Sequence, residues 1–325
     1  MLTPNTTEGL HVVLDGLSWH EGDEVVVGDE ENPAVLVAVA NFAARRGIAV
    51  KRVPVRDPRG VAAALADVIT ARTRLVVLSH VTHATGFLLP VEEVVAVTRR
   101  QGVPLLLDGA QAIGQVPFAI GASGVDFYTG AGYKWTMGPY GVGFLYVRRD
   151  WIERLAAARV GVGAQESFDA DTFGLTLRPD AGRFSFGARP WPLFIAWAAS
   201  IEWLAEIGMP FVVARIRQLR EHALGTLAGD DRVVPVPGNS SGGLLTVTAP
   251  GIDARKVVEE LGRRGIIAEW RRLPPAVAPN ATGVRLSLGF FLLKSEVDQA
   301  IRALREVVGE LATRVSDRPA PGPST

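Results

Sequence analysis

Residues 103–112 read VPLLLDGAQA, and residues 129–143 read TGAGYKWTMGPYGVG. In the first stretch an apolar run ends at Asp108, which is the pattern of a buried strand that stops at a polar side chain. In the second, Lys134 lies among glycines and aromatic residues shortly after the apolar run Val125–Tyr128. A lysine in such surroundings is poorly placed as a solvated surface charge. Both stretches therefore predict strand ends with catalytic or ligand-binding side chains.

Around these stretches, short apolar runs alternate with helical patterns up to about residue 150. Strands are expected over Glu24–Val27, Ile48–Val53, Leu75–Leu78, Val103–Leu107, Val125–Tyr128 and Val142–Val147, and helices over Pro33–Arg46, Pro58–Ala71 and Pro90–Arg100. Repeated strand–helix–strand units imply an α/β fold with a mostly parallel sheet covered by helices on both faces. In such sheets, ligands bind at the carboxyl ends of the strands.

The pattern changes after a helix over Pro192–Ile207 and a break at Gly208. A second helix is expected to about Leu227, followed by strands over Val233–Val236, Gly243–Val247, Ile266–Trp270 and Val284–Leu288 and helices over Ala254–Arg264 and Ser295–Thr313. This pattern predicts a smaller α+β domain. We expect a large domain over residues 1–208, a small domain over 209–315, and a disordered tail over 316–325, which is rich in Pro, Gly and Ser.

Composition limits the classes of partner. The chain has 34 basic and 34 acidic residues, which removes the electrostatic reason to expect nucleic acid or an anionic membrane as partner. The start of the chain lacks a signal-peptide pattern and no apolar run reaches the ~18 residues of a membrane span, so a cytoplasmic protein is expected. No cysteine is present, and the histidines show no metal spacing, so neither a disulfide nor a metal site is expected.

Asp108 and Lys134 suit one another chemically. Desolvation lowers the pKa of a lysine ammonium and makes the amine the better nucleophile that a Schiff-base lysine requires. An aspartate at a neighbouring strand end is the counter-ion that a protonated pyridine nitrogen needs. Taken singly, each residue has a plainer interpretation. Lys134 would be a lysine whose amine reaches the solvent, and Asp108 would be an aspartate that caps a turn. The pair, together with this glycine pattern, favours catalysis.

Three motifs carry a resemblance to a known family. Residues 79–86 (SHVTHATG), 107–112 (LDGAQA) and 132–135 (GYKW) resemble the signature of class V aminotransferases. These are fold-type I pyridoxal phosphate enzymes, and they include cysteine desulfurases, isopenicillin N epimerase-like proteins and kynureninases. The resemblance extends from Asn5 to about Leu311. It implies a mostly parallel sheet of the seven-stranded type between helices, a smaller C-terminal α+β domain, and here a shortened N-terminal segment.

By this resemblance, Lys134 forms the Schiff base with pyridoxal 5'-phosphate and then moves the proton at the substrate Cα. Asp108 pairs with the pyridine nitrogen, and Gln111 hydrogen-bonds the phenolic oxygen of the ring. Thr6 and Thr7 belong to a phosphate loop at the start of a helix, where backbone N–H groups and the Thr7 hydroxyl also suit a phosphate on physical grounds. A plain helix N-cap is the alternative interpretation of these two residues.

Two further residues are carried over by the resemblance, and three positions depart from it. Tyr133 lies where relatives place a phosphate contact, and Arg285 matches the arginine that binds the substrate α-carboxylate, for which a guanidinium is suited. Asn32 stands where relatives have an aromatic residue or histidine stacked on the cofactor ring, and it could equally be a helix N-cap. Ala188 replaces a threonine that reaches the phosphate of the partner subunit. His83, near the ring oxygen, either acts as acid–base or satisfies local hydrogen bonds.

The family implies an enzyme acting on an amino acid, with a homodimer as its assembly. A desulfurase passes sulfur through a cysteine persulfide, so the absence of cysteine argues against that reaction. We expect a transaminase or epimerase, because Gln111 fits that branch. A β-elimination lyase (a C–S lyase or a kynureninase-like enzyme) comes second, since residues 266–271 faintly resemble a stretch of kynureninases. A catalytically impaired scaffold or dimer partner is the hypothesis from another class.

Overall fold

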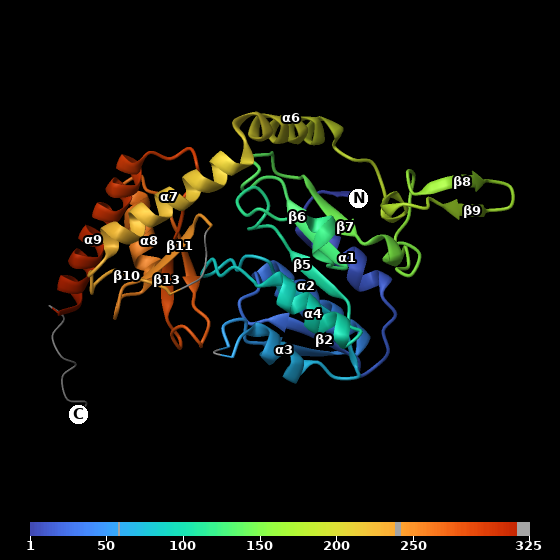
Figure 1. Cartoon of the computed structure of the whole chain (residues 1–325), viewed down its shortest axis with the longest axis horizontal. Coiled ribbons are helices and arrows are strands. Elements are labelled where there is room, and N and C mark those ends of the chain that lie inside the picture. Colours follow the sequence, from blue (N-terminus) through green and yellow to red (C-terminus); the bar gives the residue numbers. More distant parts are fainter. Residues whose placement is uncertain (58, 238–241, 317–325) are drawn as a thin grey trace, which may run out of the picture. The chain divides into compact units, whose positions relative to one another are not determined.

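The computed structural model describes residues 1–57, 59–237 and 242–316, which fall into two compact units whose elements are labelled in Figure 1. The first unit comprises Met1–His83 and Leu89–Met209, and the second comprises Ala84–Leu88 together with the chain from Pro210 onward. The short segment Ala84–Leu88 thus groups with the later part of the chain, which no local pattern indicates. Apart from Ser316, the expected tail lies outside the described residues.

A seven-stranded sheet forms the centre of the first unit. Its order is β1-β7-β6-β5-β4-β2-β3, with β1 (Leu2–Thr3), β2 (Glu24–Gly28), β3 (Ala49–Val53), β4 (Thr73–Ser79), β5 (Leu105–Asp108), β6 (Phe127–Ala131) and β7 (Gly143–Val147). The strands from β2 to β6 pair in parallel, whereas β7 is antiparallel to both β6 and β1. The predicted mostly parallel sheet is confirmed.

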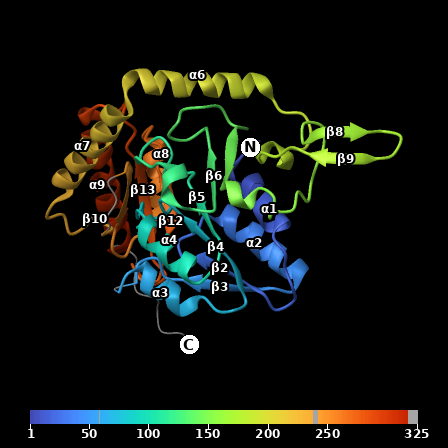
Figure 2. The ribbon, with the colours of Figure 1, turned by 45° about the vertical axis from the view of Figure 1, so that its right-hand side comes forward.

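Helices cover both faces of this sheet. Figure 2 shows α1 (Thr6–Gly16) and α2 (Pro33–Arg46) on one side and α3 (Val61–Val68) and α4 (Val91–Arg100) on the other. On the first side, Leu14 and Phe42 pack in one core with Val25, Val77 and Leu106 of the strands. Because side chains alternate along a strand, the neighbouring apolar residues face the other layer. Both faces are buried, which explains why these strands read as continuous apolar runs.

Two predicted helices of this unit had different outcomes. For α2 the predicted bounds are confirmed: the Asn32 side chain accepts from the Ala34 N–H at 2.9 Å, and Gly47 ends the helix with a φ of 65°. The helix expected over Pro58–Ala71 is shorter, since α3 begins at Val61 after Gly60, whose φ is 92°. A backbone in that region cannot belong to a right-handed helix. Pro58 itself lies outside the described residues.

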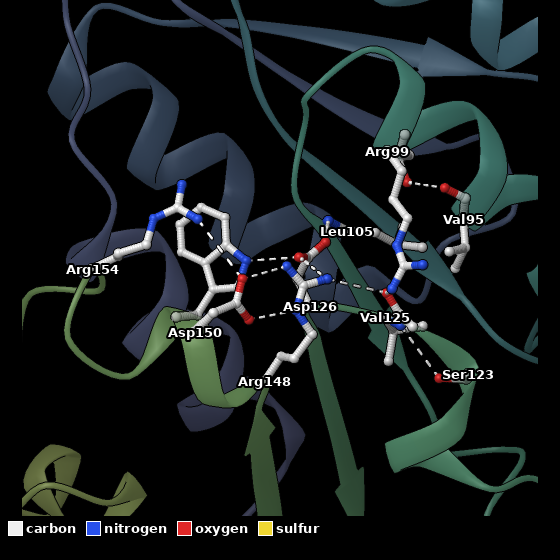
Figure 3. A network of polar contacts seen from close by, with 12 residues as sticks. Val95, Arg99, Leu105, Ser123, Val125, Asp126, Arg148, Asp150 and Arg154 are labelled. Carbon is white, nitrogen blue, oxygen red and sulfur yellow. Dashed lines mark hydrogen bonds and ion pairs between the residues drawn. The ribbon is translucent and has the colours of Figure 1, made fainter.

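The far end of β5 from Asp108 is fixed by a buried carboxylate (Figure 3). Asp126, just before β6, accepts from the Leu105 N–H at 2.8 Å and from Trp151 Nε1 at 2.7 Å. Arg148, just after β7, lies 2.9 Å from the same carboxylate. One buried acid therefore joins the start of β5, the start of β6 and the end of β7.

The segment between β7 and the first long helix holds elements that the sequence did not predict. They are the short helices η1 (Arg149–Trp151) and η2 (Ala181–Phe184) and an antiparallel hairpin of β8 (Gln165–Asp169) and β9 (Gly174–Leu177). The short helix α5 (Ile120–Ser123), which precedes β6, was not predicted either. The hairpin lacks a buried face, so no alternation of apolar and polar residues marks it. After it, α6 (Trp191–Ile207) ends at Gly208, as predicted.

Over the described residues, no single helix is long and apolar enough to cross a bilayer, and α6 with α7 (Met209–Leu227) meets that requirement only when the two are taken together as a broken pair.

The second unit contains a four-stranded antiparallel sheet of order β10-β11-β13-β12. Its elements are β10 (Val234–Pro235), β11 (Leu244–Thr248), α8 (Ala254–Arg263), β12 (Glu269–Arg272), β13 (Thr282–Ser287) and α9 (Lys294–Ser316). The helix predicted over Ser295–Thr313 is confirmed as α9, and its Val297, Ile301 and Leu304 are buried in the core of this unit. The strand expected from Ile266 begins only at Glu269, because the Ile266 N–H still bonds the Leu261 carbonyl at the end of α8.

Candidate active site

The order of the strands marks one edge of the first unit's sheet as a place for a ligand. Strand β2 has β3 on one side and β4 on the other, so the direction in which the chain adds strands reverses there. Ligands of open parallel sheets bind at the carboxyl ends of the strands, next to such a reversal. Asp29–Asn32 follows β2, the segment from His80 follows β4, and Ser79 is the register partner of Asp108 at the end of β5.

A pocket at this edge is lined by six of the predicted site residues, which are Thr6, Thr7, Asn32, Asp108, Tyr133 and Lys134. A larger cavity of about 500 Å³ borders it and shares Asn5 and Thr7. The lining of the larger cavity includes His11, Asp15 and Arg159 but, among the described residues, no lysine. A Schiff base requires a lysine amine, so the smaller pocket is the candidate site.

Asp108 presents a buried carboxylate to this pocket. The side chain accepts from the Ala110 N–H at 2.8 Å, and this is the one hydrogen bond that the described residues give it. Burial raises the pKa of Asp108, while the Ala110 N–H and the positive charge of Lys134 act in the opposite direction. A buried carboxylate with so few donors is stabilised by a further cation or N–H group. The pocket therefore fits a protonated ring nitrogen.

Lys134 lies on a loop between β6 and β7 that internal hydrogen bonds hold in place. The Gly132 carbonyl accepts from the Gly138 N–H and from the Thr136 hydroxyl, both at 2.8 Å. Trp197 Nε1 donates to the same hydroxyl at 2.9 Å, which ties the loop to α6. The Lys134 amine lies 5.7 Å from the centre of the Tyr133 ring. A loop fixed at three points keeps a half-buried amine at the pocket.

The N-terminus of α1 forms another wall. Asn5 caps the helix by accepting from the Glu8 N–H at 3.0 Å, and the Thr129 hydroxyl donates to the Thr6 carbonyl at 3.2 Å. A Cβ on Gly9 would lie 2.3 Å from Thr129 Oγ1, so this glycine allows α1 to approach β6 closely. First-turn N–H groups have no partner within a helix and bear positive partial charge. Thr6 and Thr7 therefore offer an anion site next to Lys134.

Three predicted residues form polar contacts with other parts of the chain. Gln111 accepts from Trp135 Nε1 at 2.9 Å and does not belong to the lining of the pocket. Nδ1 of His83 lies 3.3 Å from the Glu30 carbonyl, on the loop between β2 and α2, and His83 is also outside the lining. Asn32 lines the pocket, but its side-chain oxygen caps α2, so its N-cap interpretation is confirmed.

Arg285 belongs to the second unit, where it lies on the central strand β13. Burial, together with the charge of Arg271, lowers the pKa of the Arg285 guanidinium to about 10, and the Glu269 carboxylate opposes this. Glu269 contacts both Arg285 and Arg271. The guanidinium predicted to bind a substrate carboxylate thus already has a carboxylate beside it.

A buried acid next to the pocket was missed by the sequence analysis. Glu31 accepts from the Ser79 N–H at 2.8 Å and from the Ser79 hydroxyl at 2.6 Å. Burial raises the pKa of Glu31 to about 8, with the charges of Asp108 and Glu30 adding to the shift. Burial therefore favours the protonated form of the Glu31 carboxyl. Its signal in the sequence is the run of three acidic residues Asp29–Glu31 directly after the buried strand β2.

A second buried pair, His80 and Tyr128, packs against the backbone next to Asp108. His80 Nδ1 and the Tyr128 hydroxyl lie 2.9 Å apart, and burial lowers the pKa of His80 to about 4, so the ring is neutral. The Tyr128 ring lies so close to Gly109 that a Cβ there would be 2.1 Å from it. This close packing fixes the backbone that follows Asp108.

Comparison with known proteins agrees with this geometry. A family model described as Aminotransferase class-V matches residues 1–299. The isopenicillin N epimerase of Streptomyces clavuligerus is 31% identical over 326 residues, which cover 95% of this chain and 80% of that protein. A probable cysteine desulfurase of Vibrio cholerae serotype O1 is 28% identical over 318 residues, covering 94% of this chain and 77% of its own length.

Solved structures of similar proteins give the same fold. The cystine C–S lyase C-DES, in complex with its product cysteine persulfide, superposes with a TM-score of 0.82 at 29% identity, covering 95% of this chain and 81% of its own. A second C-DES structure, with glycine covalently linked to its pyridoxal phosphate cofactor, also has a TM-score of 0.82, at 28% identity, with 95% and 80% covered.

Proposed function

Because this chain belongs to the class V aminotransferase family, whose members depend on pyridoxal phosphate, we propose that it acts at the Cα of an amino acid as a transaminase or epimerase. One observation carries the proposal: Lys134 and Asp108 line a single pocket with the first turn of α1. The similarity to an isopenicillin N epimerase favours Cα chemistry within the family. A β-elimination lyase is the second candidate, because C-DES, a cystine C–S lyase, has the same fold.

The residues of the pocket suit distinct tasks. When bound, pyridoxal phosphate supplies an electron sink for negative charge at the substrate Cα. Lys134 would hold the cofactor covalently and take or return the Cα proton with its amine. Asp108 would keep the ring nitrogen protonated through a charge-assisted hydrogen bond. The first-turn N–H groups and hydroxyls of Thr6 and Thr7 would bind the phosphate, with Tyr133 beside them.

The remaining predicted roles rest on the family motif. Arg285 would bind the substrate α-carboxylate, which a buried guanidinium can do with two parallel hydrogen bonds. His83 would act as an acid–base through Nε2, since its Nδ1 faces the Glu30 carbonyl. Gln111 would hold Trp135 rather than the cofactor ring unless its amide turns. A persulfide cannot form on this chain, because its 325 residues include no cysteine.

The reaction type can be decided by product analysis. The cofactor-loaded protein is incubated in deuterium oxide with a panel of L-amino acids, with and without a 2-oxo acid as amino acceptor. We expect either a new 2-oxo acid, or a stereoisomer that carries deuterium at Cα. Pyruvate or alanine released without an amino acceptor would identify the lyase instead. A protein that binds the cofactor and exchanges no Cα proton from any member of the panel would contradict the proposal.

We also propose that two copies of the chain associate through α6. Trp191, Ile195 and Trp203 are 59%, 69% and 45% exposed, whereas Phe194 and Trp197 of the same helix are buried. Association of two protein chains through such an exposed apolar face would remove it from water, which favours binding. The expected partner is a second copy, as implied by the family.

Light scattering is expected to give twice the 34.7 kDa mass of the chain, and Ile195→Glu to shift the protein toward the monomer. Burying a charge in an apolar interface is strongly unfavourable, which is the reason for the expected shift. Val37→Glu is the matched control, because Val37 is also 69% exposed but lies on α2. A wild-type monomer that still binds the cofactor would rule out this assembly.

A further inference from the structure

We propose that Glu269 is an internal competitor for the substrate carboxylate, which occupies the Arg285 guanidinium until a carboxylate ligand displaces it. The proposal rests on the proposed function in one respect, namely the assignment of Arg285 to carboxylate binding. It adds that affinity for the substrate is set by an exchange of one carboxylate for another.

The register of the small sheet brings the two residues together. Glu269 on β12 is the direct partner of Arg285 on β13, and its Oε2 contacts Nη2 of that arginine. Arg271 lies two residues further along β12, so its side chain points to the same face, and its Nη2 contacts the same oxygen. Opposite charges directly across two strands attract one another. The contact is therefore a consequence of strand pairing.

One carboxylate contacts two guanidinium groups in this cluster, because Glu269 forms ion pairs with both Arg271 and Arg285. Glu269 can therefore leave Arg285 and still have a guanidinium partner. The bidentate fork of Arg285 matches the geometry of an incoming carboxylate.

Exposure identifies which partner moves. The Glu269 side chain is 51% exposed, whereas that of Arg285 is 8% exposed. A half-exposed carboxylate returns to water at little cost, whereas a buried guanidinium stays away from water and needs an anion near it. Arg285 is therefore the fixed member. Glu269 is the member that leaves, and it keeps the pairing with Arg271 when it does.

The size of the effect follows from competition. A ligand that binds only the free form of a site shows its intrinsic dissociation constant divided by the fraction of sites that are free. If Glu269 occupies Arg285 about nine-tenths of the time, its removal tightens carboxylate binding about tenfold. Glu269→Gln keeps the shape of the side chain and removes its charge. Glu269→Asp shortens its reach and is expected to give a smaller gain in affinity.

The test is titration calorimetry of the cofactor-loaded protein with L-alanine and with L-alaninamide, which lacks the carboxylate. Glu269→Gln is expected to lower the dissociation constant of alanine about tenfold, with no change for alaninamide. Glu259→Gln is the matched control, because Glu259 is also exposed and paired with an arginine, Arg263. It is expected to bind both ligands as the wild type does. Alanine binding that is unchanged or weaker in both Glu269→Gln and Glu269→Asp would overturn the proposal.

Arg285→Ala separates this proposal from the proposed function. If Arg285→Ala weakens alanine binding but neither Glu269 variant tightens it, Arg285 binds the carboxylate and Glu269 does not compete. If Arg285→Ala binds alanine as tightly as the wild type, the assignment of Arg285 itself is wrong. Circular dichroism of each variant shows whether the second unit is still folded.

Discussion

Lys134→Ala is expected to abolish turnover, with a loss of ~10⁴-fold or more, because general acid–base catalysis alone supplies up to about that factor. The variant removes both the amine that would hold the cofactor and the base that would move the Cα proton. Lys134→Arg should be equally inactive, since a guanidinium keeps the charge but does not form a Schiff base or release a proton near neutral pH.

Borohydride reduction followed by peptide mass spectrometry locates the covalent bond. The chain has four lysines, Lys51, Lys134, Lys256 and Lys294, so the assignment is simple. In the wild type the label is expected on Lys134 alone. Lys51→Arg is the matched control, because Lys51 pairs with Glu24 at 3.1 Å in the same unit, and this variant should keep both label and activity. A wild-type label on another lysine would refute the role of Lys134.

Asp108→Asn is expected to lower kcat by ~10² to 10⁴, since removing one partner from a buried ion pair costs about 3–5 kcal/mol. The same variant should not destabilise the cofactor-free protein. Burial raises the pKa of Asp108 in the folded state, so folding disfavours its ionised form, and stability falls as pH rises from the unfolded pKa through the folded one. Asparagine keeps the shape and removes this cost. Its melting temperature near neutral pH should therefore equal or exceed that of the wild type.

Asp126→Asn is the matched control, because Asp126 is a buried acid of the same sheet that holds Leu105, Trp151 and Arg148. It is expected to lower the melting temperature while the bound cofactor and kcat are retained. Thermal melts of the cofactor-free proteins and steady-state kinetics of the loaded ones separate the two acids. Should Asp108→Asn keep full activity, or should both variants lose stability alike, Asp108 would be a structural residue.

Local patterns in the sequence were sufficient for most of the secondary structure. The helix Pro33–Arg46 follows from an N-cap, a proline at its start and a glycine in the left-handed region at its end, all of which act within a few residues. The buried strands follow from apolar runs. The exposed β8–β9 hairpin gives no short-range signal, and it was not predicted. The helix predicted from Pro58 was too long, because the backbone at Gly60 delays the start of α3 to Val61.

The sequence alone determined the class of sheet and the family, and it predicted the two candidate catalytic residues that are recognisable from their own neighbours, Asp108 and Lys134. It could not determine which residues meet. Thr6 and Lys134 line one pocket because α1 packs on β6, and Glu31 bonds Ser79 because β2 and β4 are adjacent in the sheet. Gln111 faces Trp135, and Glu269 faces Arg285, for the same kind of reason. These contacts depend on strand order and register, which are set by the packing of distant segments and not by local preference.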